Sequence, residues 1–385
     1  MTDTPGSVDS DEEELRPTRV EVDLDVLTAN LRSIRDHVGQ ARVMAILKAN
    51  AYGHGLVPVA CHMVRQGVDS IGLALLEEAV LLRRAGVEVP ILVFGGITVK
   101  QMPQFLDHGL TLTAPSVEKL RFIDAAAAAR GVQARVHLKV DTGMERIGIH
   151  YYSARQLLEA SLTCRHVIVE GIYSHFANAD SADLGHARLQ LERFLEVLSF
   201  YDSRSLPMPV RHIANSAGIL QMPESHLDMV RPGILLYGVY PSDECVRAVN
   251  VSPALTWKSR VAYFKVVQPG HPVSYGSTWQ SDRPVRVITI PAGYGDGYFR
   301  SLSNRSEVIV RGRRFPVVGR VCMDQMMVCL EQGTAYNGDE VILLGQGDGD
   351  QGGISAADLA TWAGTIPYEV LTSINTRVPR VYRGG

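Results

Sequence analysis

The sequence lacks any long apolar run. No stretch among its 385 residues is apolar enough to cross a bilayer, which argues against a transmembrane span. The first residues, MTDTPGSVDSDEEEL, are acidic where a signal peptide has a basic stretch and then an apolar one. We therefore expect a cytoplasmic protein that does not bind membranes.

Cysteine is scarce and the net charge is small. The five cysteines are odd in number and form no C-x-x-C pair, which argues against a disulfide framework and a zinc knuckle. We expect reduced thiols and no metal site. The formal net charge of -3, with no dense run of Lys and Arg, gives no general attraction to nucleic acid. A small neutral or zwitterionic partner fits this composition better.

The rest of the composition is that of an ordinary globular protein, with 46% hydrophobic and 21% charged residues. A chain of 385 residues exceeds the size at which one core usually stops growing, so two domains are expected. Residues 1–16 form an acidic tail that is predicted to be disordered. A helix is predicted over residues 22–38 from the amphipathic spacing of Leu24, Leu27, Leu31, Ile34 and Val38.

Eight short apolar runs alternate with helix-like segments up to residue 248. They are continuous rather than alternating, which is typical of strands covered on both faces, and the intervening helices indicate parallel βα units. The runs lie at 43–47, 70–75, 91–95, 110–114, 134–140, 167–174, 210–215 and 228–234. They predict an α/β fold, namely a (β/α)8 TIM barrel over residues 17–248 that binds its ligand where the strands end.

From residue 249 to residue 385 the pattern changes. Strand-like runs such as ALTWKSRVAYFKVV and DEVILLG follow one another with Gly and Pro between them and without intervening helices. This pattern predicts a mainly antiparallel β domain with one late helix near residues 355–362. The N-terminal helix region is a candidate to pack against this domain.

Polar side chains gather at the ends of the predicted barrel strands. Because these ends converge on one mouth of a barrel, the side chains are expected to form one site. They are Lys48 after the first strand, Lys139 to Arg146 after the fifth, His175 after the sixth, Asn215 and Ser216 after the seventh, and Arg231 to Ile234 at the eighth.

Lys48 directly follows the apolar run VMAIL. At a partly desolvated barrel mouth its amine would have a depressed pKa, which suits a covalent bond to a carbonyl compound. A single lysine in this position can also be a side chain that simply extends from a strand end into solvent.

Six segments contain these residues or follow them in the chain. In order, they are AILKANAYGHG, VDTGMERIG, HIANSAG, RPGILLYG, VSYGSTW and VGRVCMDQMM. Together they resemble the alanine racemases, and the resemblance extends from Arg16 to Arg383. Six matches in order are far more specific than one short motif. The resemblance implies a barrel followed by a β domain, pyridoxal 5′-phosphate as cofactor, and a homodimer with shared active sites. It also implies racemisation of L- and D-alanine, which supplies D-alanine for peptidoglycan.

The resemblance assigns residues that hold the cofactor. Lys48 is implied to bind it covalently, Arg231 to hydrogen-bond the pyridine nitrogen, and His175 to lie beside them. Hydroxyl and backbone donors suit the phosphate dianion. The implied phosphate ligands are Tyr52, Ser216, Tyr368 and the backbone of Gly233 and Ile234.

Racemisation needs a proton source on each face of the α-carbon, and so two bases. The resemblance implies Lys48 for the D face, and Tyr275 of a partner subunit for the L face. A free tyrosine titrates near pH ~10, so a tyrosine base needs positive charge or a hydrogen bond nearby. His175 and Arg231 are the candidates. Without the motif, Tyr275 reads as an aromatic residue at a turn.

Substrate contacts are implied for Arg146 and for the backbone amide of the partner's Met323. Lys139 and Arg146 would repel each other if packed together. The matching lysine of the family is often carbamylated, which makes Lys139 a candidate for that modification. Glu145 departs from the family, where a small or amide residue is common, and it adds a negative charge beside Arg146.

Three alternative functions remain open on the sequence. A broader amino-acid racemase would differ only in a few side chains around the substrate. A decarboxylase of basic amino acids should have an acid in place of Arg231 at the ring nitrogen. A non-catalytic carrier of pyridoxal phosphate would resemble only the barrel half of the chain.

Overall fold

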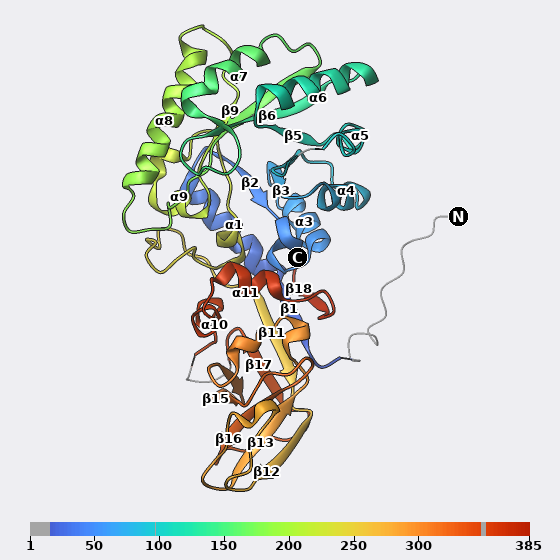
Figure 1. The fold of residues 1–385 in the computed structure, drawn as a ribbon, viewed down its shortest axis with the longest axis vertical. Helices are drawn as coiled ribbons and strands as arrows, with labels where there is room; N and C mark the ends of the chain where they lie inside the picture. The colour runs from blue at the N-terminus through green and yellow to red at the C-terminus, as the bar shows by residue number, and fades with distance from the viewer. Residues whose placement is uncertain (1–15, 97, 348–351) are drawn as a thin grey trace, which may run out of the picture. The chain divides into compact units, whose positions relative to one another are not determined.

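The computed structural model describes residues 16–96, 98–347 and 352–385. They fall into two compact units (Figure 1). Val26–Ser252 form the first, here called the barrel unit, and residues 16–25 with 253–385 form the second, here called the β unit. The sequence had suggested boundaries at residues 17 and 249, whereas the structure groups residues 16–25 with the C-terminal part. The predicted disordered tail, apart from Arg16, lies outside the described residues.

The barrel unit is built on eight parallel strands, one at each of the eight apolar runs, which confirms the predicted barrel. Strands follow one another in chain order, and the last of them pairs with the first. Backbone bonds from Asp228 N to Arg211 O (3.2 Å) and from Arg231 N to Ala214 O (3.0 Å) join the seventh and eighth strands and close the ring. The strands are β2 (Arg42–Ile46), β3 (Ser70–Leu73), β4 (Ile91–Val93), β5 (Thr111–Ala114), β6 (Ala134–Asp141), β8 (Val167–Tyr173), β9 (Val210–His212) and β10 (Met229–Val230), and the short β7 (Ile149–His150) pairs with β6.

Helices alternate with these strands and lie around the outside of the barrel (Figure 1). The five apolar residues predicted for the first helix are all buried. Ser116 caps the alanine-rich helix that follows it by accepting the Lys119 N–H at 3.1 Å, as expected for an N-cap. The helices are α1 (Leu24–Val38), α3 (Leu56–Arg65), α4 (Leu76–Arg84), α5 (Met102–Asp107), α6 (Val117–Arg130), α7 (Ala154–Ser161), α8 (Gly185–Asp202) and α9 (Ser216–Gln221), and the short element α2 (Lys48–Tyr52) lies between β2 and α3.

The predicted first helix begins two residues later than expected. Residues Arg19–Asp23 form strand β1, in which Val20 and Val22 are fully buried on one face of a sheet. The two valines alternate with charged residues, which is the period of a strand. Pairing with β11 favours the strand over the predicted helix. As a result, the segment that precedes the barrel belongs to the β unit.

The β unit contains one sheet of nine strands among its described residues, in the order β12-β13-β16-β15-β14-β17-β11-β1-β18. All pairs are antiparallel except β1 with β18, so the mainly antiparallel prediction is confirmed. The strands are β11 (Leu255–Arg260), β12 (Tyr263–Val267), β13 (Val285–Ile290), β14 (Glu307–Val310), β15 (Arg313–Val318), β16 (Met326–Glu331), β17 (Glu340–Leu344) and β18 (Arg380–Arg383).

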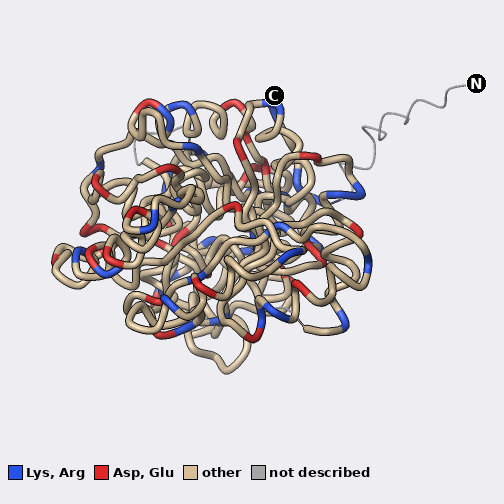
Figure 2. The backbone as a smooth tube through the Cα atoms, turned by 90° about the horizontal axis from the view of Figure 1, so that it is seen from above, with Lys and Arg blue, Asp and Glu red and all other residues tan. Residues whose placement is uncertain are grey.

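The predicted late helix is α10 (Ala356–Ala363), and a second helix, α11 (Pro367–Ser373), follows it. Ser355 and Asp358 cap α10 reciprocally, each accepting a backbone N–H from the other. Short 3-10 turns complete the described elements: η2 (Tyr151–Ser153), η3 (Pro223–Ser225), η4 (Ile234–Tyr237), η5 (Tyr275–Ser277), η6 (Tyr294–Asp296) and η7 (Arg300–Leu302). Basic and acidic residues are interspersed along the backbone (Figure 2).

The short element α2, directly after the first barrel strand, is a left-handed turn. Four consecutive residues that are not glycine, Ala49 to Tyr52, have φ between 50 and 56°. A left-handed conformation costs roughly 1–2 kcal/mol per L-residue, so the surroundings must hold it. Asn50 does so: its N–H donates to Glu78 at 3.3 Å, and its side chain accepts the Leu56 N–H at 2.8 Å. The turn keeps Lys48 and Tyr52 at the barrel mouth.

Candidate active site

The ends of the barrel strands carry the side chains that the sequence singled out. Lys48 follows β2, Lys139 lies in β6, His175 follows β8, and Arg231 follows β10. The charges of Lys48, Lys139, Arg231 and Arg146 all act on the imidazole of His175. The structure therefore brings these five residues together at one mouth.

Part of the Lys48 side chain is exposed to solvent, but enough protein surrounds its amine to desolvate it. Desolvation lowers the pKa of Lys48, the positive charge of Arg146 lowers it further, and Glu78 opposes both effects. A larger fraction of the amine is therefore neutral and nucleophilic than in a free lysine.

Arg231 is buried, with 4% of its surface exposed, and its guanidinium is extensively hydrogen-bonded. Nη1 donates to His212 Nδ1 at 2.8 Å. Nη2 is within hydrogen-bond distance of Ser174 O (2.8 Å), Ile213 O (3.0 Å) and His175 Nδ1 (3.1 Å). Among the described residues, the Nε–H of Arg231 has no acceptor, so one donor remains for a ligand.

These bonds fix the protons of two further histidines. A guanidinium can only donate, so His212 Nδ1 must accept and His212 must carry its proton on Nε2. That proton then points at His137 Nδ1, which lies 2.8 Å away. His212 and His137 are both buried, so a directed chain of hydrogen bonds runs from Arg231 into the barrel interior.

The interior keeps these imidazoles neutral. Burial, and then the charge of Arg231, lowers the pKa of His137 to about 3 and the pKa values of His175 and His212 well below their usual value. Burial also lowers the pKa of Arg231 to about 10, so it stays protonated at neutral pH. Arg231 is thus the charged member of a neutral network.

Lys139 is buried in β6, with 6% of its surface exposed. Its Nζ donates to Val140 O at 2.8 Å and lies 5.1 Å from the ring centre of Tyr173. Desolvation, followed by the charge of Arg231, lowers the pKa of Lys139 to about 7, with Asp141 opposing. Near neutral pH this amine is partly neutral.

Arg146 is exposed and sits in a turn that Asp141 organises. The Asp141 carboxylate accepts backbone N–H groups of Gly143 (2.8 Å), Met144 (2.9 Å) and Arg146 (3.1 Å). Glu145 extends to solvent, with 66% of its side chain exposed, and lies 3.6 Å from His150. Its carboxylate thus has a partner other than Arg146.

A cluster of donors suited to an anion lies between the seventh and eighth strands. The Ser216 hydroxyl accepts the N–H groups of Gly233 at 2.9 Å and Leu235 at 3.3 Å, which leaves its own proton to donate. The Ile234 N–H has no acceptor among the described residues. A side chain at Gly233 would place its Cβ 2.6 Å from the Tyr52 hydroxyl, so only glycine permits this approach. The donor set fits a phosphate group.

Three predicted site residues lie in the β unit. Tyr275 begins η5 and is 73% exposed, Met323 is 53% exposed, and Tyr368 lies in α11. Left-handed backbone at Ser274 (φ 68°) and Ser277 (φ 50°) flanks Tyr275. A hollow of about 450 Å³ beside Tyr275 is lined by residues that include Ser274 and Cys322.

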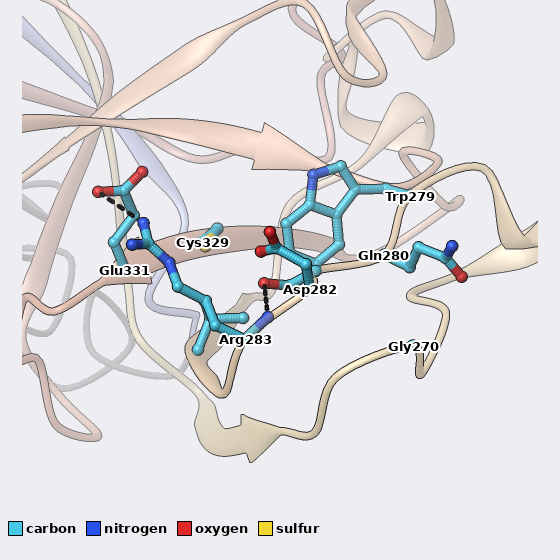
Figure 3. Close-up of a pocket in the computed structure, with 9 residues that line it drawn as sticks. Gly270, Trp279, Gln280, Asp282, Arg283, Cys329 and Glu331 are labelled. Carbon is cyan, nitrogen blue, oxygen red and sulfur yellow. Dashed lines mark hydrogen bonds and ion pairs between the residues drawn. The ribbon is translucent and has the colours of Figure 1, made fainter.

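A second hollow of the β unit, of about 650 Å³, contains none of the predicted site residues (Figure 3). Trp279 and Cys329 line it, and Arg283 Nη2 lies 3.9 Å from Glu331 Oε2 at its edge. Within the described part of the chain, no group of three His, Cys, Asp or Glu residues could hold a metal ion. No helix in that part has both the length and the apolarity to cross a membrane.

A closed βα barrel with a lysine, a buried arginine and a phosphate-sized donor set at its mouth, joined to an antiparallel β unit, defines a class of barrel enzymes with a β domain. Comparison with known proteins narrows this class. The model of the alanine racemase N-terminal domain matches residues 22–241, and that of the C-terminal domain matches residues 254–382. The chain therefore belongs to the alanine racemase family, and it is an isomerase of that class.

Individual relatives agree with the family models. The alanine racemase of Symbiobacterium thermophilum is 44% identical over 371 residues, covering 96% of this chain and 98% of the relative. The structure of alanine racemase from D-cycloserine-producing Streptomyces lavendulae has a TM-score of 0.91 at 37% identity, with 96% and 98% coverage. A Bartonella henselae alanine racemase with covalently bound pyridoxal phosphate has a TM-score of 0.86 at 28% identity, with 95% and 99% coverage.

The sequence did not point to His137, His212 or Tyr173. All three lie inside barrel strands, and their role emerges only from the contacts across the barrel. The Tyr173 ring stacks on His212 with centroids 4.9 Å apart, and its hydroxyl lies 2.9 Å from Thr113 Oγ1. A polar residue within an apolar strand was the available signal.

We predict that His137→Phe lowers the free energy of unfolding by about 1–3 kcal/mol, because the His212 Nε2–H loses its acceptor in a buried site. His137→Asn keeps an acceptor near the same position and should cost less. Urea unfolding of the three proteins measures both effects. Equal destabilisation by Phe and Asn would show that the hydrogen bond does not contribute.

Proposed function

We propose that the chain interconverts L- and D-alanine with pyridoxal 5′-phosphate bound at the barrel mouth. The observation that carries this proposal is the convergence of Lys48 and Arg231 at strand ends, with the Ser216 donor set following the adjacent strand β9. When bound, the cofactor supplies an electron sink for negative charge at the substrate α-carbon. The Bartonella relative is described with that cofactor covalently bound, which supports the choice.

Each part of the cofactor has suitable residues in this chain. The depressed pKa of Lys48 suits covalent attachment of the aldehyde carbon. The Ser216 hydroxyl and the Ile234 N–H would hold the phosphate, with Tyr52 on the Gly233 side and Tyr368 contributed by the β domain.

Arg231 distinguishes racemisation from decarboxylation. Its unused Nε–H would donate to the ring nitrogen, with His175 beside it, and a guanidinium cannot give up its proton there. A decarboxylase of basic amino acids should have an acid in this position, and the site has a buried arginine instead. The carrier alternative is disfavoured because the C-terminal family model matches the β domain.

Two residues of the chain would move the proton at the α-carbon. The Lys48 amine would hold it on the D side and the Tyr275 hydroxyl on the L side. The arrangement needs one group on each face, since inversion delivers the proton to the side opposite the one from which it left.

We propose that Tyr275 comes from a second copy of the chain, in a homodimer with shared sites. Support comes from its 73% exposure and from the fact that Tyr275 belongs to the β unit, whereas Lys48 belongs to the barrel unit. Arg146 and the partner's Met323 amide would orient the substrate carboxylate.

The enzyme would supply D-alanine for peptidoglycan in the cytoplasm, where the five free cysteines fit a reducing environment.

Lys139 is proposed to carry a carbamate. The neutral amine would form an N–C bond to carbon dioxide and release one proton, which turns a buried cation into an anion. The charges of Arg231 and Arg146 would then attract this group, whereas they repel the ammonium form.

The first test follows the circular dichroism of L-alanine in D₂O with the cofactor-loaded protein. We expect the signal to decay to zero while deuterium enters the α-position, as mass analysis would show. Lys48→Ala is the matched control: with this variant the circular dichroism signal should persist and no deuterium should enter the α-position. A persistent signal with alanine would contradict the assignment, and the same assay with serine would then test the broader racemase.

The shared site predicts complementation. Lys48→Ala and Tyr275→Phe should each be nearly inactive, because each lacks one proton-transfer group. In a mixed dimer one of the two sites regains both groups, so equal mixing should restore roughly a quarter of the wild-type activity. No recovery after verified subunit exchange would instead indicate a site within one chain.

The Lys139 proposal predicts a carbamate ¹³C resonance after incubation with labelled bicarbonate. The signal should be stronger above pH ~7 than below it, because the reacting amine is neutral only above the Lys139 pKa of about 7. Lys139→Met should abolish the signal, and Lys100→Met, a change at an exposed lysine, should retain it. A resonance that survives Lys139→Met would refute the assignment.

A further inference from the structure

The turn that presents Met323 is held by backbone bonds to a second turn. Cys322 N donates to Gln325 O at 2.9 Å, which closes the turn on itself. Tyr294 N donates to Cys322 O at 3.0 Å, and Gly295 N donates to Met323 O at 2.9 Å. The Met323 N–H has no acceptor among the described residues, so it is free to bind a ligand.

The two turns touch so closely that no side chain fits between them. A Cβ at Gly293 would lie 2.2 Å from Cys322 O and 2.5 Å from Met323 O. The position of residues 293–296, which include η6, therefore determines where the Met323 amide lies.

Arg377, near the end of the chain, spans both turns. Its Nε donates to Asp296 Oδ1 at 2.6 Å, and its Nη2 donates to Asp324 Oδ1 at 2.5 Å. A Cβ at Gly295 would lie 3.0 Å from the Arg377 guanidinium carbon, so the guanidinium packs directly on that backbone. One planar group thus links the second turn to the residue after Met323.

The inner end of this bridge is firmly fixed. Asp296 is fully buried, and its carboxylate also accepts from Arg16 Nη2 at 2.5 Å and from Gly293 N at 3.0 Å. Burial alone would raise the pKa of Asp296, but Arg377 and Arg16 outweigh it and hold the pKa below its usual value. Asn375 N donates to Asp296 O at 2.9 Å, which ties the Arg377 segment to the same turn.

The outer end is different. Asp324 is 62% exposed, and Arg377 is its one ion-pair partner among the described residues. An exposed ion pair by itself contributes little to stability, about 0–1 kcal/mol. What this pair does is link the residue after Met323 to the second turn, which holds the Met323 turn through Gly295 N–Met323 O and Tyr294 N–Cys322 O.

We propose that Arg377 is a positioning residue, which through Asp324 and the buried Asp296 holds the Met323 amide in place to bind the carboxylate of the amino-acid substrate. This inference rests on the proposed role of the partner's Met323 in substrate binding. Arg377 itself is not placed in contact with substrate or cofactor.

The test compares Arg377→Lys, Asp324→Asn and the double variant with wild type. Lysine keeps the charge but cannot donate to both carboxylates in one plane. We expect KM for alanine to rise roughly threefold to tenfold, as for a weakened hydrogen bond to a charged group, with kcat within about twofold. Because both changes break one bridge, the double variant should be no worse than the worse single variant.

Hydrogen exchange provides a readout that is independent of activity. Peptides that cover residues 320–326 should exchange faster in both single variants, while cofactor content and the thermal midpoint stay close to wild type. Arg283→Lys is the matched control, because its pair with Glu331 joins two exposed side chains at 3.9 Å in the same unit (Figure 3). It should change neither KM nor exchange in that segment.

Unchanged exchange at residues 320–326 would overturn the positioning role, whatever the kinetics. Faster exchange with unchanged KM, in a wild-type enzyme that racemises alanine, would overturn the link to substrate binding. If Asp324→Asn lowered the cofactor content, the thermal midpoint and kcat together, the bridge would only stabilise the fold, and the positioning role would be overturned. Failure of the wild type to racemise alanine would contradict the proposed function instead, and the exchange data would still decide the positioning role.

Discussion

The buried guanidinium of Arg231 is the group on which the rest of the barrel mouth depends. Burying a charge costs several kcal/mol unless hydrogen bonds compensate, and the carbonyls of Ser174 and Ile213 with His212 provide that compensation. Because a guanidinium only donates, the neighbouring imidazoles must accept and stay neutral. Burial and this one charged residue together keep the interior imidazoles neutral.

Four positive charges meet at the mouth, and Glu78 and Asp141 offset them only in part. Lys48, Lys139, Arg146 and Arg231 all act on His175, whereas Asp141 directs its carboxylate to backbone N–H groups. Repulsion among these like charges raises the free energy of the site. Each anionic group proposed for this site, whether a phosphate, a substrate carboxylate or a carbamate on Lys139, would relieve this repulsion, so the same electrostatic imbalance would favour all three.

Continuous apolar runs predicted all eight barrel strands, because strands covered on both faces are apolar over most of their length rather than at alternate positions. The placement of Lys48 and Arg231 at strand ends followed from the same pattern. The sequence could not place β1 or β18, since these short strands are stabilised by partners far away in the chain. The paired residues of β1 and β11 are more than 230 positions apart, and those of β1 and β18 are farther apart still. It also missed His137 and His212, because the hydrogen bond between them joins β6 to β9, two strands that are distant in the chain.

The pairing of β1 with β18 has a consequence for biosynthesis. Arg19–Asp23 emerge from the ribosome long before their parallel partner Arg380–Arg383. The intervening barrel, with mostly local βα contacts, can fold as it is made. The edge of β1 opposite β11 stays unpaired until Arg380–Arg383 have been made. Until β18 is in place, the nascent chain thus carries one strand edge that is exposed to association with other chains, and chaperones that shield such edges would act on this segment.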